Sequence, residues 1–378
     1  MKKLLVFIVA TLLISCNKVN MVTEETFHGT IDGKKVELFT LTNLNGVIAQ
    51  FTNYGGRWIS MWVPDKNGKP GDVILGFDNP ASYQNAREPY HGAITGRVCG
   101  RINKGVFVLN EDTIRLANND LFGNPVKNHL HGGINGFHKQ MWNGKTGKDK
   151  NKDEYVELFY ESKNGEEGFP GNLKVTVRYT LTSNNTLRIK YTAKTDVPTI
   201  VNLTNHAFFN MSGDPAQSVS SQLLEINADY YLECDKELIP TGIVKSIKGT
   251  PIDFTKAIEI GKNISVDFPE IKKNQGYAIA YVLNKGKDEL NFAARLTDTK
   301  SGRSVAVYTN QPSFQMYNAW LMDGSDVGKQ NIKYKSGCSV VLESQGFPDA
   351  PNHSNFPTIK LNPRELYNHI VEYRFENK

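Results

Sequence analysis

Alternation of apolar and polar side chains is the feature that most constrains the fold of this chain. Every second residue is apolar from 173 to 181, and the pattern returns from 187 to 193. A period of two places the apolar side chains on one face of an extended strand, and the polar residues 183–186 between the runs can turn the chain. These residues are therefore predicted to form a β-hairpin with one buried face.

Short runs of the same kind recur along the chain. They lie at residues 47–51, 59–63, 155–160, 292–296, 305–308 and 370–375. Apart from the N-terminal segment, we find no long stretch with an apolar period of 3.6 residues. Many strands separated by Gly, Asn and Asp turns predict an all-β protein, a large antiparallel β-sandwich, with sites on one sheet face or in the loops.

The N-terminus has the composition of a targeting segment. Two lysines precede an apolar run at residues 4–14, which is too short for a helix that stays in a bilayer. Residues 13–16 then resemble a bacterial lipobox, in which the cysteine is lipidated and the chain is cut before it. The alternative is a plain secretory peptide with an incidental cysteine. We predict a lipoprotein signal peptide at 1–15, lipidation of Cys16, a tether at 16–23 and one domain at 24–378.

Composition bears on compartment and partners. A lipidated chain is expected in the bacterial cell envelope, held to a membrane by its anchor and otherwise soluble. The formal net charge is only +5, with basic and acidic residues interspersed, so no nucleic-acid partner is expected. Apart from Cys16, the cysteines are Cys99, Cys234 and Cys338, an odd number without metal-type spacing, so no obligatory disulfide framework is expected.

A polar stretch at residues 202–210 contains a single titratable side chain, His206. Amides, a hydroxyl and two aromatic rings surround it in the sequence. Histidine has an unperturbed pKa of about 6.5, so His206 is a candidate for proton transfer near neutrality. The alternative is a core histidine whose ring is hydrogen-bonded by Asn202 or Asn205.

Two segments before this stretch carry possible ligands. Arg97 and Arg101 are four residues apart, so on one strand they would point to the same side and could present guanidinium groups to hydroxyl oxygens. Arginines on an exposed sheet face have the same spacing. His129 and His131 have a spacing that can hold a metal on a strand, but no third ligand is evident nearby in the sequence, and we predict no metal site.

Two segments after it carry further polar groups. Gln315 lies in residues 311–318, where amides alternate with aromatic rings, a mixture that suits stacking on a sugar face, yet is also ordinary for a strand with one buried side. Glu343 follows an apolar run, where partial burial would raise its pKa and make it a competent base. A solvent-facing Glu343 would have no such role.

Together these segments resemble the aldose 1-epimerase (galactose mutarotase) family, and the resemblance runs over nearly the whole mature chain. The matching segments are residues 53–56, 72–77, 96–98, 101–102, 130–133, 166–171, 202–206, 240–242, 311–312, 342–345 and 347–350. Each is short, but their number and order make chance improbable. The resemblance implies the galactose mutarotase-like supersandwich, an antiparallel β-sandwich that binds a hexose in an open groove without a cofactor.

The resemblance also implies roles for individual residues. Interconversion of α and β anomers opens the sugar ring to an aldehyde, so one group must take the proton of the C1 hydroxyl while another protonates the ring oxygen. The family's base matches Glu343 and its acid matches His206. The residues that match His131 and Arg101 hold the ring oxygen and neighbouring hydroxyls, and Gln315 matches a binding glutamine.

Two departures from the family pattern bear on sugar choice. Where the family usually reads Gly-Tyr/Phe-Asp-His-Asn, this chain has Gly-Tyr-Ala-Ile-Ala at residues 276–280, so Ala278 replaces a carboxylate that bonds sugar hydroxyls. The asparagine before the family's binding arginine is Gly100 here. Alanine cannot accept a hydrogen bond from a hydroxyl, so affinity or sugar choice is expected to differ from a typical member.

The sequence therefore predicts a mutarotase for free hexoses of the glucose or galactose type. The alternative is a non-catalytic carbohydrate-binding lipoprotein on the same fold. Because a decayed enzyme is expected to lose its proton-transfer groups first, the presence of both Glu343 and His206 favours the enzyme. A hexose-phosphate epimerase would need a compact basic cluster, and the sequence shows none.

Overall fold

The structure is a computed structural model that describes residues 19–120 and 127–378. The predicted signal peptide and Cys16 lie outside the described residues. Within the described part, the α-helices are α1 (Pro80–Asn85) and α2 (Pro269–Asn274), and no helix there is long and apolar enough to cross a membrane. Strands make up nearly all of the other regular structure, which confirms the all-β prediction.

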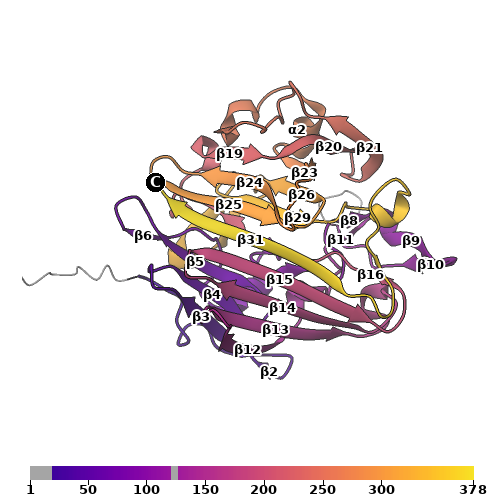
Figure 1. Cartoon of the computed structure of the whole chain (residues 1–378), viewed down its shortest axis with the longest axis horizontal. Coiled ribbons are helices and arrows are strands. Elements are labelled where there is room, and N and C mark those ends of the chain that lie inside the picture. Colours follow the sequence, from indigo (N-terminus) through magenta and orange to yellow (C-terminus); the bar gives the residue numbers. More distant parts are fainter. Residues whose placement is uncertain (1–18, 121–126) are drawn as a thin grey trace, which may run out of the picture.

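The largest sheet has nine antiparallel strands. In spatial order they are β12 (Asn143–Lys148), β13 (Glu154–Ser162), β14 (Leu173–Leu181), β15 (Thr186–Thr195), β31 (Tyr367–Asn377), β25 (Arg303–Thr309), β24 (Asn291–Thr297), β19 (Leu223–Ile226) and β22 (Ile258–Glu259). The predicted hairpin is β14 and β15, paired from Leu181 and Leu187 outward. The C-terminal strand β31 crosses the front of the molecule between β25 and β15 (Figure 1).

Two smaller antiparallel sheets complete the main architecture. The six-stranded sheet contains β18 (Phe208–Phe209), β29 (Val340–Gln345), β26 (Ser313–Tyr317), β23 (Ala278–Leu283), β20 (Ala228–Cys234) and β21 (Pro240–Ser246). The four-stranded sheet contains β3 (Leu38–Thr42), β4 (Ile48–Thr52), β5 (Trp58–Pro64) and β6 (Pro70–Asp72). Figure 1 shows the six-stranded sheet beside β24 and β25, and the four-stranded sheet beside β13–β15.

The remaining strands form short pairs. They are β1 (Thr30–Ile31) with β2 (Lys34–Lys35), β7 (Ile94–Thr95) with β17 (Thr204–Asn205), β8 (Arg101–Ile102) with β11 (His129–Leu130), β9 (Val106–Leu109) with β10 (Asp112–Arg115), β16 (Thr199–Ile200) with β30 (Lys360–Leu361), and β27 (Asp323–Val327) with β28 (Lys333–Lys335). The pairs β7–β17 and β8–β11 position residues of the site.

The three large sheets share one hydrophobic core. Trp58 on β5 contacts Phe209 on β18 and Tyr373 on β31, with ring centroids 5.6 and 5.4 Å apart. All three rings are buried. The nine-stranded sheet therefore packs against both smaller sheets, and the architecture is the sandwich that the alternation predicts.

Strand β29 separates this core from the site. The carbonyl of Leu342 accepts a hydrogen bond from the Tyr373 hydroxyl at 3.3 Å, and Ser344 Oγ lies 2.9 Å from Nε2 of His369, so both residues face β31. Because successive side chains of a strand alternate between its two faces, Glu343 points to the opposite face of the six-stranded sheet.

Candidate active site

A pocket lies over the face of the six-stranded sheet that points away from the nine-stranded sheet. Its floor comes from β29, β26, β23 and β20, and its walls come from β8, β11, the first residue of β21 and the loops at 88–90 and 236–238. His206 enters it directly after β17. The pocket brings together all five side chains predicted to act on substrate: Glu343, His206, Arg101, His131 and Gln315.

Glu343 is a deeply buried acid on the pocket floor. The residue is 2% exposed, and its Oε1 has no hydrogen-bond partner among the described residues. Burial raises the pKa of Glu343 to about 8; the charge of Glu88 acts in the same direction, whereas Arg101 acts against it. A carboxyl group with a pKa close to neutrality and an unbonded oxygen is suited to proton exchange with a ligand.

His206 faces Glu343 across the pocket, with Nε2 3.9 Å from Oε2 of the acid. Two backbone hydrogen bonds fix its position, one donated to the carbonyl of Ala93 at 2.8 Å and one accepted from the N–H of Gly92 at 2.9 Å. Burial lowers the pKa of His206 to about 3, so the imidazole is neutral at pH 7. A separation of 3.9 Å is too long for a hydrogen bond, which leaves both groups available to a ligand.

The neighbouring amides do not hold the His206 ring, as the alternative interpretation required. Asn202 exchanges two hydrogen bonds with the backbone of Gly346, at 2.8 and 3.2 Å. Asn205 donates to the carbonyl of Gly92 at 2.7 Å. Both amides fix backbone around the site, and the imidazole remains directed at Glu343.

His131 supplies a hydrogen-bond donor next to this pair. Its Nδ1 accepts a hydrogen bond from the backbone N–H of Gly100 at 3.3 Å. In a neutral imidazole one nitrogen accepts and the other donates, so Nε2 of His131 carries the hydrogen. The rings of His131 and His206 lie 5.3 Å apart, and burial, followed by the charges of His206 and Arg101, lowers the pKa of His131 well below its usual value.

Arg101 reaches the pocket from β8 and is held by an acid that the sequence did not suggest. Its Nε and one terminal nitrogen donate to the two oxygens of Asp120, at 2.6 and 3.3 Å. A two-pronged contact of this kind fixes the plane of the guanidinium group. Asp120 was missed because it follows two asparagines in a loop, where no pattern marks it.

The structure corrects the prediction for Arg97. Its side chain is buried away from the pocket and donates to Ser162 and to the carbonyls of Pro170 and Gly171. The expected shared side with Arg101 was wrong because residues 96–100 are not part of one strand: β7 ends at residue 95 and β8 begins at residue 101. Arg97 joins loops and does not bind a ligand in the pocket.

Gln315 extends the floor beside Glu343. On β26 it pairs with Glu343 of β29 on one side and with Ala280 of β23 on the other. The next pocket-facing position of β23 is Ala278, which pairs with Tyr317. The floor therefore changes from polar to apolar across neighbouring strands, in the direction from β29 to β23.

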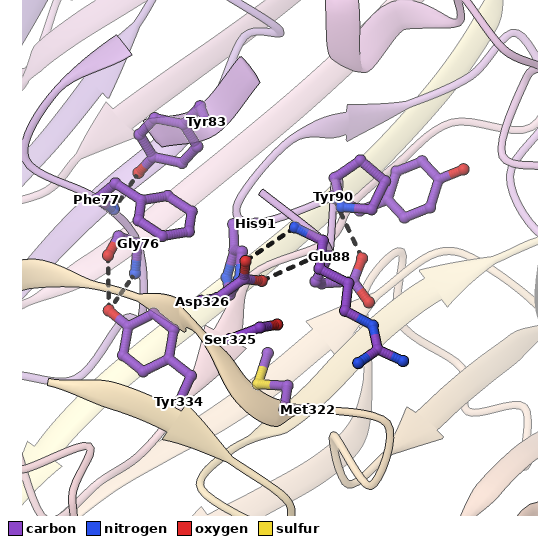
Figure 2. A network of polar contacts seen from close by, with 12 residues as sticks. Gly76, Phe77, Tyr83, Glu88, Tyr90, His91, Met322, Ser325, Asp326 and Tyr334 are labelled. Atoms are coloured by element: carbon purple, nitrogen blue, oxygen red, sulfur yellow. Dashed lines mark hydrogen bonds and ion pairs between the residues drawn. The ribbon is translucent and has the colours of Figure 1, made fainter. Parts of the chain in front are cut away.

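Glu88 is a second buried carboxyl group that lines the pocket. Figure 2 shows its contacts with Tyr90 and Asp326. Glu88 is 7% exposed, its Oε1 accepts from the backbone N–H of Tyr90 at 3.2 Å, and its own N–H donates to Asp326 at 3.0 Å. Burial raises the pKa of Glu88 to about 7, and the charge of Asp326 contributes to the increase. The sequence gives no signal for Glu88, because it precedes a proline in a loop.

The pocket also contains a set of possible metal ligands, which differs from the pair His129 and His131 considered in the sequence. His129 points elsewhere, since its Nδ1 lies 2.7 Å from the carbonyl oxygen of Ala117 and it does not line the pocket. In contrast, His131, His206 and Glu343 each offer one donor atom, and these three atoms lie within 4.8 Å of one another. Two imidazoles and a carboxylate are ligands that suit Zn²⁺ and related metals.

These groups can carry out paired proton transfer. With a pKa of about 8 for Glu343 and about 3 for His206, the pair holds one proton over a wide pH range. One group can then take a proton from a ligand while the other gives one, without a change in the charge of the buried site. Arg101 and His131 add donors that stabilise developing negative charge on an oxygen.

Comparisons with known proteins identify the family of the chain. The family described as aldose 1-epimerase matches residues 37–374. Galactose mutarotase from Bos taurus is 38% identical over 323 residues, which cover 85% of this chain and 89% of that protein. Aldose 1-epimerase from Escherichia coli K12 is 33% identical over 346 residues, which cover 91% and 96%.

The fold shows the same relationship. The crystal structure of galactose 1-epimerase from Lactobacillus acidophilus superimposes with a TM-score of 0.80 at 27% identity, and the match covers 93% of this chain and 97% of that one. The predicted galactose mutarotase-like sandwich is therefore confirmed. From the extent of these matches, the chain belongs to the aldose 1-epimerase family.

Proposed function

We propose that this protein is an aldose 1-epimerase, an isomerase that interconverts the α and β anomers of a free aldose. The observation that carries the proposal is the approach of Glu343 and His206 to 3.9 Å inside one pocket, with pKa values shifted in opposite directions. The pair supplies both the base and the acid that ring opening needs. The reaction moves only protons and one C–O bond, so we propose no cofactor.

The proposed mechanism uses the single proton that Glu343 and His206 hold between them. The Glu343 carboxylate takes the proton of the C1 hydroxyl while the His206 imidazolium protonates the ring oxygen, the C1–O5 bond breaks, and an open-chain aldehyde forms. After rotation about the C1–C2 bond, the ring oxygen attacks the other face of C1 and the two protons return. Opening leaves Glu343 protonated and His206 neutral, which is also the protonation state that burial favours in the empty pocket.

Sugar binding brings the pair to the reactive state. Hydroxyl groups that donate to the Glu343 carboxylate stabilise its charged form and lower its pKa. We propose that Arg101 and His131 hold the ring oxygen and adjacent hydroxyls, where their donors stabilise the charge that develops as the C1–O5 bond breaks. Gln315 is placed next to Glu343 on the floor and is proposed to bind a hydroxyl.

Polarimetry on freshly dissolved α-glucose and α-galactose tests the proposal. The expected result is a rate above that of buffer, reduced by about 10²-fold or more in Glu343→Gln and in His206→Asn, since removal of a general acid or base costs this much. Glu289→Gln is the matched control, because Glu289 is exposed and does not line the pocket. A Glu343→Gln protein with undiminished rate would contradict the base assignment.

A non-catalytic carbohydrate-binding protein is the second candidate. The observation that favours it is Ala278, which leaves the pocket floor without a carboxylate at that position. Calorimetry separates the two: sugar binding without any acceleration in the polarimeter supports the binder. Acceleration that depends on Glu343 excludes it.

We also propose that the protein is a bacterial lipoprotein, cut before Cys16 and anchored in the cell envelope by acyl chains. The support is in the sequence, where two lysines, an apolar run at residues 4–14 and Cys16 follow one another. Incorporation of labelled palmitate into the wild-type protein, and its loss in Cys16→Ala with release from the membrane fraction, is the expected result. Unlabelled wild-type protein in the soluble fraction would contradict the anchor.

A further inference from the structure

We propose that one end of the sandwich lies on the anionic membrane surface that holds the lipid anchor, so that the pocket points away from the membrane. This inference goes beyond the sugar reaction and rests on the proposed lipidation of Cys16. The surface in question, which we call the turn face, is formed by the turns at residues 43–46, 65–69, 149–153, 182–185 and 298–302.

Hydrogen bonds join these turns to one another. The turn at 43–46 donates to the turn at 182–185 at 2.8 Å, and the latter donates to the turn at 149–153 at 3.0 Å. The turn at 65–69 donates to the turn at 298–302 at 2.9 Å. The end of β31 links the two groups, with one hydrogen bond to 182–185 and one to 65–69. The turns therefore form one continuous surface at this end of the molecule.

The N-terminal segment is attached to the body close to the turn face. Val22 is buried; its N–H donates to the side-chain amide of Gln50 at 3.2 Å, and its carbonyl accepts from the same amide at 2.8 Å. Gln50 lies two residues from Ile48, where β4 leaves the turn at 43–46. Figure 1 shows the first described residues, in indigo, on the same side of the molecule as β6 and the C-terminus, whereas β8 and β11 of the pocket wall lie toward the opposite side.

This attachment limits the reach of the anchor. Cys16 precedes Val22 by six residues, and six residues span at most about 22 Å when fully extended. A compact domain of this length has a radius of gyration of about 20 Å, and therefore a diameter of about 50 Å. An anchor at Cys16 thus keeps the turn face near the membrane and the pocket on the far side away from it.

The outermost charges of the turn face are positive. Its exposed lysines take part in no ion pair among the described residues: Lys66, Lys69, Lys150, Lys152 and Lys300. The acids of the same turns are half-buried or buried, and each accepts a backbone N–H at 2.7–3.0 Å: Asp65, Asp149, Asp153 and Asp298. Because screening limits electrostatic attraction to about 8 Å at physiological ionic strength, an anionic headgroup layer responds mainly to the projecting lysines.

Leu44 adds an apolar side chain among these lysines. It is 100% exposed in the hairpin between β3 and β4. The side chain of Asn43 holds this hairpin, since its Oδ1 accepts the N–H groups of Asn45 and Val47 at 3.0 and 3.1 Å. A single exposed leucine is ordinary on a protein surface. A fixed leucine that projects from a surface rich in lysines suits the membrane interface, where apolar side chains enter the headgroup region and basic ones bind anionic lipids.

Fluorescence quenching tests this orientation in the full-length protein, reconstituted in vesicles of equal parts phosphatidylcholine and phosphatidylglycerol. A fluorophore on Asn67→Cys, in the turn face, is compared with one on Glu111→Cys, in the exposed turn between β9 and β10 on the opposite side (Figure 1). Both are placed in Cys234→Ala, because Cys99 and Cys338 are buried. A nitroxide on the lipid headgroup quenches only fluorophores close to the membrane. We expect loss of most fluorescence at position 67 and no loss at position 111.

A charge-reversal variant tests whether the turn face itself causes this orientation. It combines Leu44→Asp with Lys→Glu at positions 66, 69, 150 and 152. The matched control makes the same change in net charge at exposed positions outside the turn face, with Leu366→Asp and Lys→Glu at positions 248, 256, 285 and 287. Quenching at position 67 should fall in the first variant and in high salt, and should stay at the wild-type level in the control.

The outcomes separate this inference from the lipidation on which it rests. Equal quenching at the two positions, stronger quenching at position 111, or quenching at position 67 that the turn-face variant leaves unchanged overturns the orientation and leaves the anchor standing. Wild-type protein without acyl chains in its mass spectrum overturns the anchor. In that case the same protein is added to phosphatidylglycerol vesicles. Salt-sensitive binding, weakened by at least about fivefold for each turn-face lysine replaced, supports the turn face, and absence of binding overturns it.

Discussion

The Oε2 atom of Glu343 and the Nε2 atom of His206 lie 3.9 Å apart, and burial shifts their pKa values in opposite directions. In the proposed mechanism these two residues, one on β29 and one in the segment after β17, form one proton-transfer unit. With a pKa of about 8 for Glu343 and about 3 for His206, the mechanism assigns the unit a single proton at neutral pH.

This relationship predicts the pH profile of the enzyme. Since the pair must hold one proton, kcat/KM should be level between about pH 4 and pH 7, and should fall as Glu343 ionises near its pKa of about 8 and as His206 gains a second proton near its pKa of about 3. Initial rates by polarimetry, corrected for the buffer-catalysed reaction at each pH, check this. A fall centred near pH 6.5 would instead indicate an ordinary histidine as the limiting acid.

Replacement of Glu88 should move the alkaline limit of that profile. The negative charge of Glu88 contributes to the raised pKa of Glu343, so its removal in Glu88→Gln lowers the pKa of Glu343 and shifts the fall in kcat/KM to lower pH. The profile of Glu289→Gln, which removes an exposed acid, should retain the wild-type limit. An alkaline limit that stays in place in Glu88→Gln would show that the two carboxyl groups do not interact.

Burial of Glu343 should also make the protein less stable as pH rises. Its pKa of about 8 in the folded protein exceeds the ordinary value of 4.5, so the folded state holds a proton that the unfolded state loses, and stability falls between these two values. Each pKa unit corresponds to about 1.4 kcal/mol. Glu343→Gln, which removes this titration, should therefore gain stability over wild type by about 1–4 kcal/mol at pH 9 relative to the difference at pH 4.

Urea unfolding at the two pH values measures this gain. Glu289→Gln serves as control and should show no pH-dependent difference from wild type, because the side chain is exposed. A Glu343→Gln protein whose stability relative to wild type is the same at both pH values would contradict a raised pKa for Glu343.

Removal of metal should not change the rate, whereas added metal should lower it. The proposed reaction uses protein side chains alone, so a chelator should leave the rate unchanged. Added Zn²⁺ should inhibit in competition with the sugar, because the donor atoms of His131, His206 and Glu343 lie within 4.8 Å of one another. In His131→Asn, residual activity should be less sensitive to Zn²⁺. Loss of activity on chelation, restored by a metal, would contradict the metal-free mechanism.

The strands were predictable wherever one face is buried. The run at 173–181 is strand β14 to the residue, since a period of two leaves little choice of register or boundary when each apolar side chain enters the core. The same logic marked Glu343 at the end of an apolar run. The prediction for Arg97 was wrong, because residues four apart point to the same side only on a continuous strand. The backbone between Arg97 and Arg101 is not one strand.

The site was predictable only in part. The resemblance to the aldose 1-epimerase family predicted five site residues, and the fold places all of them in one pocket: Glu343, His206, His131, Arg101 and Gln315. Two acidic residues near the site were not predicted. Glu88 lines the pocket wall, and Asp120 accepts a hydrogen bond from Arg101. Both lie in loops without periodicity, and their partners are fixed only by the three-dimensional path of the chain.

The alternation of β29 has a consequence for how this protein can diverge. Leu342 and Ser344 contact β31 on one side while Glu343 enters the pocket on the other. An insertion or deletion of a single codon upstream within this strand would exchange the two faces, bury an ionisable group among apolar neighbours and place leucine where the sugar binds. Evolution of this strand is therefore restricted to substitutions. Insertions and deletions among homologues should accumulate in the loops that border the pocket.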